Sequence, residues 1–174
     1  MPQIFANPNL PNYFVNASDV TSAATARDFV AEYEEGKVIT FPNLDVNIDV
    51  DFWATLDLDV FPSLKKFSFN VGPDDLCDVS HQTKKLASQG LDGELAGALA
   101  NRLRATLAAL SPIYRRIFSN YDFDEDKKKV VWRLNTIMNE NMHVDTYKEE
   151  SQSHFARMFV NLDSQPRIWQ TSWP

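Results

Sequence analysis

Residues 130–138 read VVWRLNTIM, residues 155–162 read FARMFVNL, and residues 167–172 read RIWQTS. Each stretch is rich in β-branched and aromatic side chains, a composition that predicts a β-strand. Most of the chain before residue 129 carries helical patterns instead. Helices followed by strands indicate an α+β domain, in which the helices pack against a mainly antiparallel sheet.

Two helices are predicted upstream of these strands. Residues 22–35 place apolar side chains at helical spacing, Gly36 is positioned to end that helix, and residues 37–41 form a short strand. A longer helix is predicted from about residue 91 to residue 119, with a break at Ser111-Pro112 where the proline opens a second helix. Its apolar stripe is interpreted as core and consists of Leu95, Leu99, Leu103, Leu107 and Leu110.

Four other stretches carry weaker patterns. Prolines predict an extended arm for residues 1–17. Residues 49–58 fit a short helix, and residues 67–71 alternate as a strand does. Residues 72–90 are polar and are predicted to form a loop with helical turns.

The composition indicates one globular domain spanning residues 1–174. Hydrophobic residues make up 44% and charged residues 24% of the chain. A net charge of −7 repels phosphate backbones, which argues against nucleic acid as a general partner. The single cysteine cannot form an internal disulfide, so a cytoplasmic location is expected. Neither a signal peptide nor a membrane-spanning segment is recognisable.

The motif His143-Val144-Asp145 lies between two predicted strands. Residues i and i+2 of a strand point to the same face, so this imidazole and this carboxylate can reach one point. They would form two corners of the 2-His-1-carboxylate triad of non-haem Fe(II) oxygenases. By itself, the same spacing also fits a surface turn with an incidental His and Asp.

The surroundings of this motif narrow its interpretation. MHVDTY at 142–147 is followed by ARMFVNLD at 156–163 and PRIWQ at 166–170, and EGKVITFP stands at 35–42. This order of motifs resembles the Kdo hydroxylase family. The likeness is tight in residues 142–170 and loose between residues 43 and 130.

The resemblance implies an Fe(II)/2-oxoglutarate-dependent dioxygenase with a double-stranded β-helix core of the jelly-roll, cupin-like type. Residues 1–128 would form a mainly helical part packed on that core, and residues 129–174 would form its start. The family hydroxylates Kdo, an acidic sugar of bacterial lipopolysaccharide. The expected reaction is therefore hydroxylation of a small or lipid-linked sugar acid, similar to that of Kdo 3-hydroxylase, as part of lipopolysaccharide modification.

The resemblance also assigns residues to roles. His143 and Asp145 would be the catalytic iron ligands. The expected cofactor contacts, from neighbouring strands, are Arg133, Asn135, Arg157 and Asn161. For both arginines an ordinary salt bridge is an equal alternative. Three further residues would line the pocket: Trp132, Arg167 and Trp169. The two tryptophans fit the core better, because aromatic side chains are mostly buried for packing.

The sequence departs from the family after the motif. The family needs a distal histidine and then an arginine that pairs with 2-oxoglutarate, and neither follows in this chain. The remaining histidines, His81 and His154, do not occupy the distal position. Fewer strands are predicted after residue 129 than the about eight that such a core needs. The core is therefore expected to be partial, in a fragment or in a shortened relative whose open sheet edge a second copy could cover.

Two alternatives to the oxygenase stay open. One is a non-catalytic sugar-binding or protein-binding module on a shortened oxygenase scaffold. The other is a different cupin-like metal protein, in which His143, Asp145 and His154 hold Mn or Zn. The sequence motif alone does not separate these functions.

Overall fold

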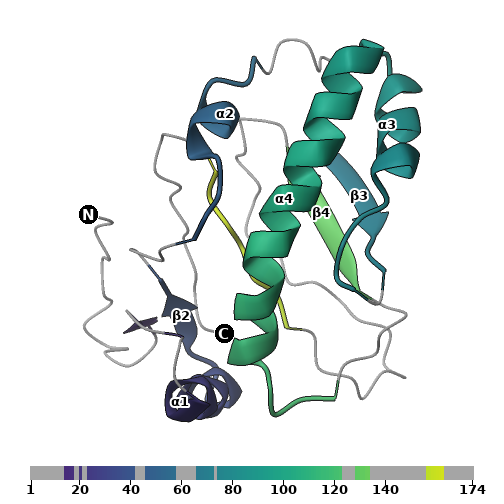
Figure 1. Cartoon of the computed structure of the whole chain (residues 1–174). Coiled ribbons are helices and arrows are strands. Elements are labelled where there is room, and N and C mark those ends of the chain that lie inside the picture. The colour runs from purple at the N-terminus through teal and green to yellow at the C-terminus, as the bar shows by residue number, and fades with distance from the viewer. Residues whose placement is uncertain are drawn as a thin grey trace.

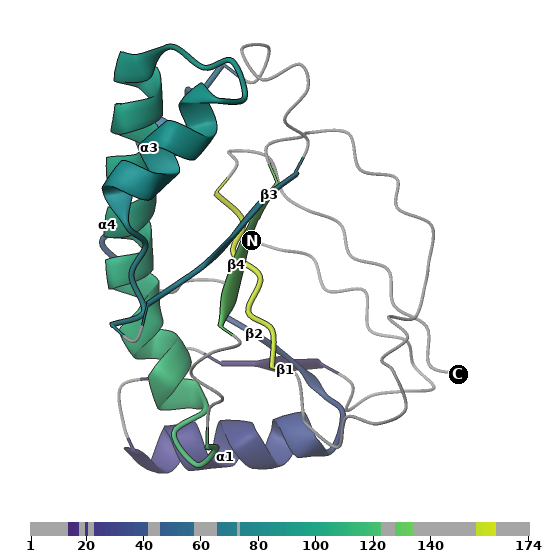
Figure 2. The ribbon, with the colours of Figure 1, turned by 90° about the vertical axis from the view of Figure 1, so that its right-hand side faces the viewer.

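The computed structural model describes residues 14–17, 20, 23–41, 46–57, 66–72, 74–122, 128–133 and 156–162, which combine helices and strands (Figure 1). In chain order the elements are β1 (Phe14–Asn16), α1 (Ala23–Glu34), β2 (Val38–Thr40), α2 (Val50–Ala54), β3 (Lys66–Asn70), α3 (Val79–Ala87), α4 (Gly93–Ile117) and β4 (Lys129–Arg133). Helices α3 and α4 form a layer on one side of the β3–β4 pair (Figure 2). The β1–α1–β2 unit lies near the C-terminal end of α4.

Two clusters of buried side chains hold these layers together. The main core lies between the α3–α4 layer, α2 and the β3–β4 pair, and consists of Trp53, Phe67, Phe69, Cys77, Leu86, Leu91, Ala96, Leu99, Ala100, Leu103 and Leu107. The small core joins the N-terminal unit to the end of α4, and consists of Ala17, Val20, Phe29, Ile117 and Phe118. Helix α4 contributes to both cores.

Helix α4 begins after Asp92, whose carboxylate accepts hydrogen bonds from the backbone N–H groups of Glu94 and Leu95 at 2.8 and 3.3 Å. Such capping satisfies donors that have no partner inside the helix. The predicted apolar stripe packs into the core, because Leu99 and Leu103 are each only 2% exposed. Burial of this stripe fixes which face of α4 turns toward the sheet.

The predicted break at Pro112 is wrong, because α4 continues through this residue to Ile117. Proline lacks the N–H that an interior helix position donates, and this normally breaks or bends a helix. Here Ile117 and Phe118 follow with 3% and 5% exposure in the small core. Burial of these two side chains offsets the lost hydrogen bond and keeps the last turns helical.

Strands β3 and β4 pair antiparallel, with Phe67 opposite Trp132 and Asn70 opposite Lys129. Phe67 and Phe69 are buried, whereas Val131 is exposed, so the two faces of the pair alternate as the period of a strand requires. The strand predicted at 67–71 and the start of the strand predicted at 130–138 are confirmed.

The N-terminal unit contains a parallel pair, β1 with β2, connected through α1. The predicted helix at 22–35 and strand at 37–41 are confirmed, and Gly36 has a φ of 81°, the left-handed conformation that ends a helix. The short helix expected within residues 49–58 is α2. Strand β1 falls within residues 1–17, for which an extended arm was predicted, and its pairing with β2 was not predicted.

Two further predictions need correction. Residues 79–87, within a stretch predicted to be a loop with helical turns, form the continuous helix α3, because Asp78 caps its first turn and Gln82 and Leu86 bury one face. Residues 156–162, expected to be a strand, form no regular element within the described residues. The described strands form two two-stranded sheets. The double-stranded β-helix stays a prediction.

Candidate functional site

Most residues assigned to the iron site lie outside the described residues. These are His143, Asp145, Asn135 and His154, together with Arg167 and Trp169. Arg133 is the last residue of β4, opposite Lys66. Arg157 and Asn161 belong to the described segment 156–162, where both are exposed and both already take part in interactions.

Trp132, for which the sequence allows a pocket role as well as a core role, packs against the main core. Its ring meets that of Trp53 edge to face, with centroids 4.2 Å apart and an interplanar angle of 79°. Trp53 in turn donates a hydrogen bond from Nε1 to Thr106 Oγ1 at 3.2 Å. The core role predicted as the better fit for Trp132 agrees with this packing.

The segment that follows the motif is anchored at both ends. The Tyr114 hydroxyl donates to the carbonyl oxygen of Ala156 at 3.1 Å, and Ala156 packs against the small core. Leu162 packs against the main core. Phe159 and Val160, between these anchors, are 63% and 41% exposed. In the sequence, residues 134–155 therefore lie between two stretches, β4 and 156–162, that both pack on the body of the protein.

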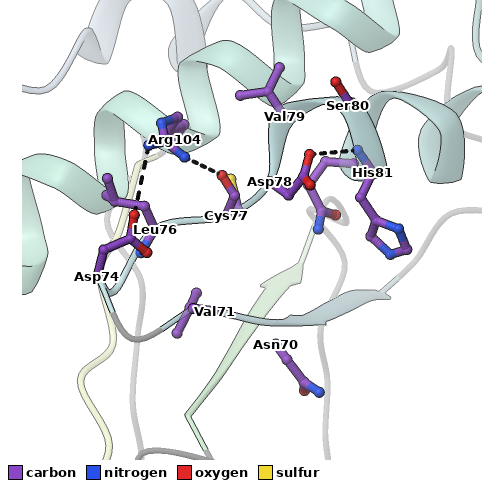
Figure 3. A pocket seen from close by; sticks show the side chains of 12 residues that line it. Asn70, Val71, Asp74, Leu76, Cys77, Asp78, Val79, Ser80, His81 and Arg104 are labelled. Atoms are coloured by element: carbon purple, nitrogen blue, oxygen red, sulfur yellow. Dashed lines mark hydrogen bonds and ion pairs between the residues drawn. The ribbon is translucent and has the colours of Figure 1, made fainter.

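The described residues contain a hollow of about 600 Å³ between the end of β3, the connection to α3 and the first turn of α3 (Figure 3). We call this the loop hollow; it is lined by Asn70, Val71, Gly72, Asp74, Leu76, Cys77, Asp78, Val79, Ser80, His81, Gln82 and Arg104. A second hollow of about 450 Å³, the lysine hollow, is lined by Ser68, Phe69, Asn70, His81, Gln82, Lys85 and Lys129. The two adjoin, since Asn70, His81 and Gln82 line both.

Asp75 holds the loop that forms one wall. Its φ of 61° is the left-handed conformation, which Asp tolerates better than most residues. Arg115 donates to its carboxylate from both Nε and Nη2, and Lys128 Nζ lies 2.6 Å from Oδ1. Hydrogen bonds from Arg115, together with Lys128, hold the pKa of Asp75 below its usual value in spite of burial. This carboxylate therefore ties the loop to α4 and to the start of β4.

Arg104 and Cys77 close the other side of the loop hollow. Arg104 Nη1 donates to the Cys77 carbonyl oxygen at 2.6 Å, and its Nη2 lies 3.8 Å from Asp74 (Figure 3). The Cys77 side chain is in the main core with 1% exposure, and burial raises the pKa of its thiol. A buried thiol with a raised pKa is a poor nucleophile, so this hollow is not a cysteine-based catalytic site.

The residue that caps α3, Asp78, supplies an acidic group to the loop hollow. Asp78 accepts the backbone N–H of His81 at 3.0 Å, and this bond is the main reason that the pKa of Asp78 lies below its usual value (Figure 3). Because Asp78 is already the cap of α3, the helix N-terminus is occupied by a carboxylate of the chain itself. Among the described residues, no group of three or more His, Cys, Asp or Glu side chains could hold a metal ion.

The lysine hollow has the opposite electrostatic character. None of the described residues that line it is acidic, and two of them are lysines. Lys85 Nζ donates to the Ser68 carbonyl oxygen at 2.6 Å and lies 4.6 Å from the centre of the Phe67 ring. Lys129 comes from β4 and is exposed. The arrangement suits binding of an anion better than acid–base or nucleophilic chemistry.

Neither hollow was predicted from the sequence, where residues 72–90 were expected to form a loop with helical turns. A signal was nevertheless present in the sequence. Val79, Gln82 and Leu86 recur at helical spacing after a capping aspartate, and Gln82 is the polar member of that stripe. A glutamine on the buried face of a helix indicates a polar contact inside the protein.

Comparison of this chain with protein-family models, with curated proteins and with solved structures finds no match. Within the described residues, no helix is both long enough and apolar enough to cross a membrane.

Proposed function

We propose that this protein is an Fe(II)/2-oxoglutarate-dependent dioxygenase that hydroxylates a sugar acid, similar to Kdo 3-hydroxylase. The observation that carries the proposal is the spacing of His143 and Asp145 within an order of motifs that resembles the Kdo hydroxylase family. Imidazole and carboxylate donors with open positions form the donor set that non-haem Fe(II) oxygenases use. The chemistry of these two residues therefore fits iron.

The packing around the motif supports the proposal indirectly. A site that binds iron must hold its ligands in a fixed geometry, and this requires rigid neighbouring segments. Before the motif, β4 is paired with β3 and Trp132 packs on Trp53. After the motif, Ala156 and Leu162 pack on the two cores. Both flanks are thus attached to the body of the protein.

In this proposal the chain's own residues orient the reactants. His143 and Asp145 would hold the metal, which when bound supplies the O₂ chemistry that side chains lack. Arg133 and Arg157 are the candidates to pair with a carboxylate of 2-oxoglutarate, since a guanidinium can donate two parallel hydrogen bonds to it. Asn135 and Asn161 would add neutral donors and acceptors for the co-substrate or the sugar.

The proposal is tested by anaerobic titration of Fe(II) into the chain in the presence of 2-oxoglutarate. We expect a weak visible charge-transfer band that is lost in His143→Ala and in Asp145→Ala. His81→Ala is the matched control, because His81 is exposed on α3 in the described part of the chain and should leave the band unchanged. Succinate formation in air then measures turnover with candidate sugar acids.

The other histidine variant separates the remaining functions. Loss of metal binding in His154→Ala would indicate a compact site of His143, Asp145 and His154 instead. Absence of any band in the unchanged chain would contradict the oxygenase proposal for this chain and favour a non-catalytic binding module. Binding of a sugar acid without iron, measured by calorimetry, would then support that module.

A further inference from the structure

Asp92 and Gly93, the two residues at which α4 begins, form a pair that is chemically reactive in an unfolded chain. Among all aspartates and asparagines of the sequence, only Asp92 is followed by glycine. Glycine has no side chain to shield its backbone nitrogen, and its backbone rotates more freely than that of other residues. This nitrogen can therefore reach the side chain of the preceding aspartate more easily than any other backbone nitrogen of the chain can.

The reaction is an intramolecular ring closure that changes the course of the main chain. The Gly93 nitrogen forms a bond to Cγ of the protonated Asp92 carboxyl group, and the hydrogen of that nitrogen leaves with the carboxyl hydroxyl as water. Water then reopens the five-membered imide at either of its two carbonyl carbons. One product is the original aspartate. In the other, isoaspartate, the main chain runs through Cβ and Cγ of Asp92, and no further reactant is consumed.

In the folded protein, the backbone conformation of Asp92 opposes this ring closure. The ring closes only when the Gly93 nitrogen and Cβ of Asp92 are nearly eclipsed about the Cα–C bond, because the five ring atoms approach one plane. Asp92 instead has a ψ of 145°, an extended conformation in which these two atoms are turned well apart. The attacking nitrogen therefore does not face Cγ until this bond rotates.

Three hydrogen bonds oppose that rotation while the first turn of α4 is formed. The Asp92 carboxylate accepts the backbone N–H groups of Glu94 and Leu95 at 2.8 and 3.3 Å. The Asp92 carbonyl oxygen accepts the N–H of Ala96 at 2.8 Å, and rotation about the Cα–C bond turns this oxygen away. Leu91 and Ala96, on the two sides of this turn, are buried in the main core with 8% and 0% exposure. Capping and packing thus hold the unreactive conformation.

We propose that Asp92-Gly93 is a site of spontaneous isoaspartate formation and that α4 controls it. The reaction is blocked while the first turn of α4 is hydrogen-bonded, and it proceeds when that turn opens. Isoaspartate adds one methylene group to the main chain, so its carboxylate and its carbonyl no longer match the positions that cap the helix. An opened turn is then converted into a lasting defect at the start of the helix that contributes to both cores. This inference uses only described residues and is independent of the proposed oxygenase activity.

The first test compares the folded full chain with the same chain unfolded in guanidinium. Both are kept warm at slightly acidic pH, and liquid chromatography of their proteolytic peptides separates isoaspartyl from aspartyl forms of equal mass. We expect isoaspartate in place of Asp92 in the unfolded chain, and formation at least about tenfold slower in the folded chain. A synthetic peptide of residues 88–97, too short for a stable helix, corrects for any effect of guanidinium on the reaction itself.

Two outcomes of this comparison would overturn the proposal. Equal rates in the folded and the unfolded chain would show that α4 does not control the reaction. Absence of isoaspartate at this position in the unfolded chain would show that Asp92-Gly93 is not a site of the reaction at all.

Gly93→Ala tests the chemistry of the ring closure. A Cβ atom at this position would have no contact within 4 Å beyond its own turn of the helix, so the variant should fold as the unchanged chain does. Its methyl group hinders the attacking nitrogen, so isoaspartate formation in the unfolded chain should slow by about tenfold or more. An unchanged rate in unfolded Gly93→Ala would show that ring closure through this nitrogen is not the route.

A matched pair of variants in the next turn of α4 tests the control by the helix. Gly97→Ala adds a good helix former where a Cβ atom has open space, and Ala98→Gly removes one at an exposed position. Neither residue contributes a reacting atom. In the folded chain we expect isoaspartate formation to be roughly threefold slower in Gly97→Ala and roughly threefold faster in Ala98→Gly, with unchanged rates in guanidinium. Folded-chain rates that do not follow helix stability in this way would contradict control by α4.

The modified chain provides an independent readout. Chain that has formed isoaspartate in guanidinium is purified by chromatography and refolded beside unmodified chain treated in the same way. We expect the isoaspartyl chain to unfold at a lower urea concentration, because the start of α4 has lost its cap. Equal unfolding midpoints would show that isoaspartate leaves no lasting defect in the helix.

Discussion

The indole rings of Trp53 and Trp132 meet edge to face, with centroids 4.2 Å apart, and this contact joins α2 to β4 across the main core. Aromatic pairs in this geometry stabilise a protein beyond the area that they bury. We therefore expect Trp132→Ala to lower the free energy of unfolding by about 2–4 kcal/mol. Urea unfolding followed by circular dichroism measures the change.

Val131→Ala is the matched control for this prediction. Val131 neighbours Trp132 in β4, but it is on the opposite face and is 42% exposed. Truncation of Val131 to alanine should lower the free energy of unfolding by less than about 1 kcal/mol. Equal losses in the two variants would mean that the tryptophan contact contributes little.

Asp75 is the electrostatic tie between the loop before α3, helix α4 and the residue before β4. Asp75→Asn keeps the shape of the side chain and tolerates the same left-handed backbone, but it removes the charge opposite Arg115 and Lys128. Arg115 is partly exposed, which reduces the cost. We expect a loss of about 1–3 kcal/mol at neutral pH, measured by urea unfolding. An unchanged free energy of unfolding in Asp75→Asn would mean that solvent replaces the interactions of the carboxylate.

The contribution of Asp75 should also depend on pH. Its pKa in the folded protein lies below its usual value, so its stabilising effect is complete above the pKa of the unfolded chain, about 4. It is lost as the pH falls through the lower pKa of the folded state. The stability difference between the unchanged chain and Asp75→Asn should therefore shrink from pH 5 downward. A difference that stays constant down to acid pH would contradict this assignment.

Cys77 should be unreactive in the folded protein. Its side chain is 1% exposed and burial raises its pKa, so little thiolate forms and reagents cannot reach it. We expect no reaction with Ellman's reagent at neutral pH and full reaction after unfolding in guanidinium. Because the chain has a single cysteine, the signal reports this site alone. Rapid labelling of the folded chain would show that the main core opens at this point.

Pro112 should limit the stability of α4. It stands inside the helix, where it leaves one backbone carbonyl without its usual donor, and its side chain is exposed. Pro112→Ala restores the donor, so we expect thermal unfolding to show a gain of up to about 3 kcal/mol. Ala105→Gly, at an exposed position of the same helix, should instead lower the free energy of unfolding by about 1 kcal/mol. A loss in Pro112→Ala would show that the proline fits this helix without strain.

Local patterns predicted the elements whose signals lie in neighbouring residues. The leucines of α4 and the alternation of β3 needed no distant information, and Gly36 marked the end of α1. Pro112 misled the prediction, because the burial of Ile117 and Phe118 that maintains the helix depends on α1, which is far away in sequence. The parallel pairing of β1 with β2 is likewise a tertiary feature.

The candidate sites also divide into features that neighbouring residues reveal and features that depend on tertiary packing. His143 and Asp145 attract notice in the sequence because their chemistry and spacing are local, and their role stays a prediction. Gln82 stands at helical spacing with Val79 and Leu86 in the sequence, but its burial and its unpaired oxygen among the described residues are known only from the packing. Lys129 reaches the same hollow from β4, through strand pairing that no short motif encodes.

The antiparallel register that places Asn70 opposite Lys129 has a consequence for the order of folding. These residues are separated in the chain by all of α3 and α4, so their pairing must first meet the entropy of closing a long loop. Helices α3 and α4 are neighbours in sequence and contact each other directly, and contacts of this local kind form quickly. The helical hairpin should therefore appear early and bring the two strand ends together. Pairing of β3 with β4, which also brings Lys129 to the lysine hollow, is then the slow step on the way to the native protein.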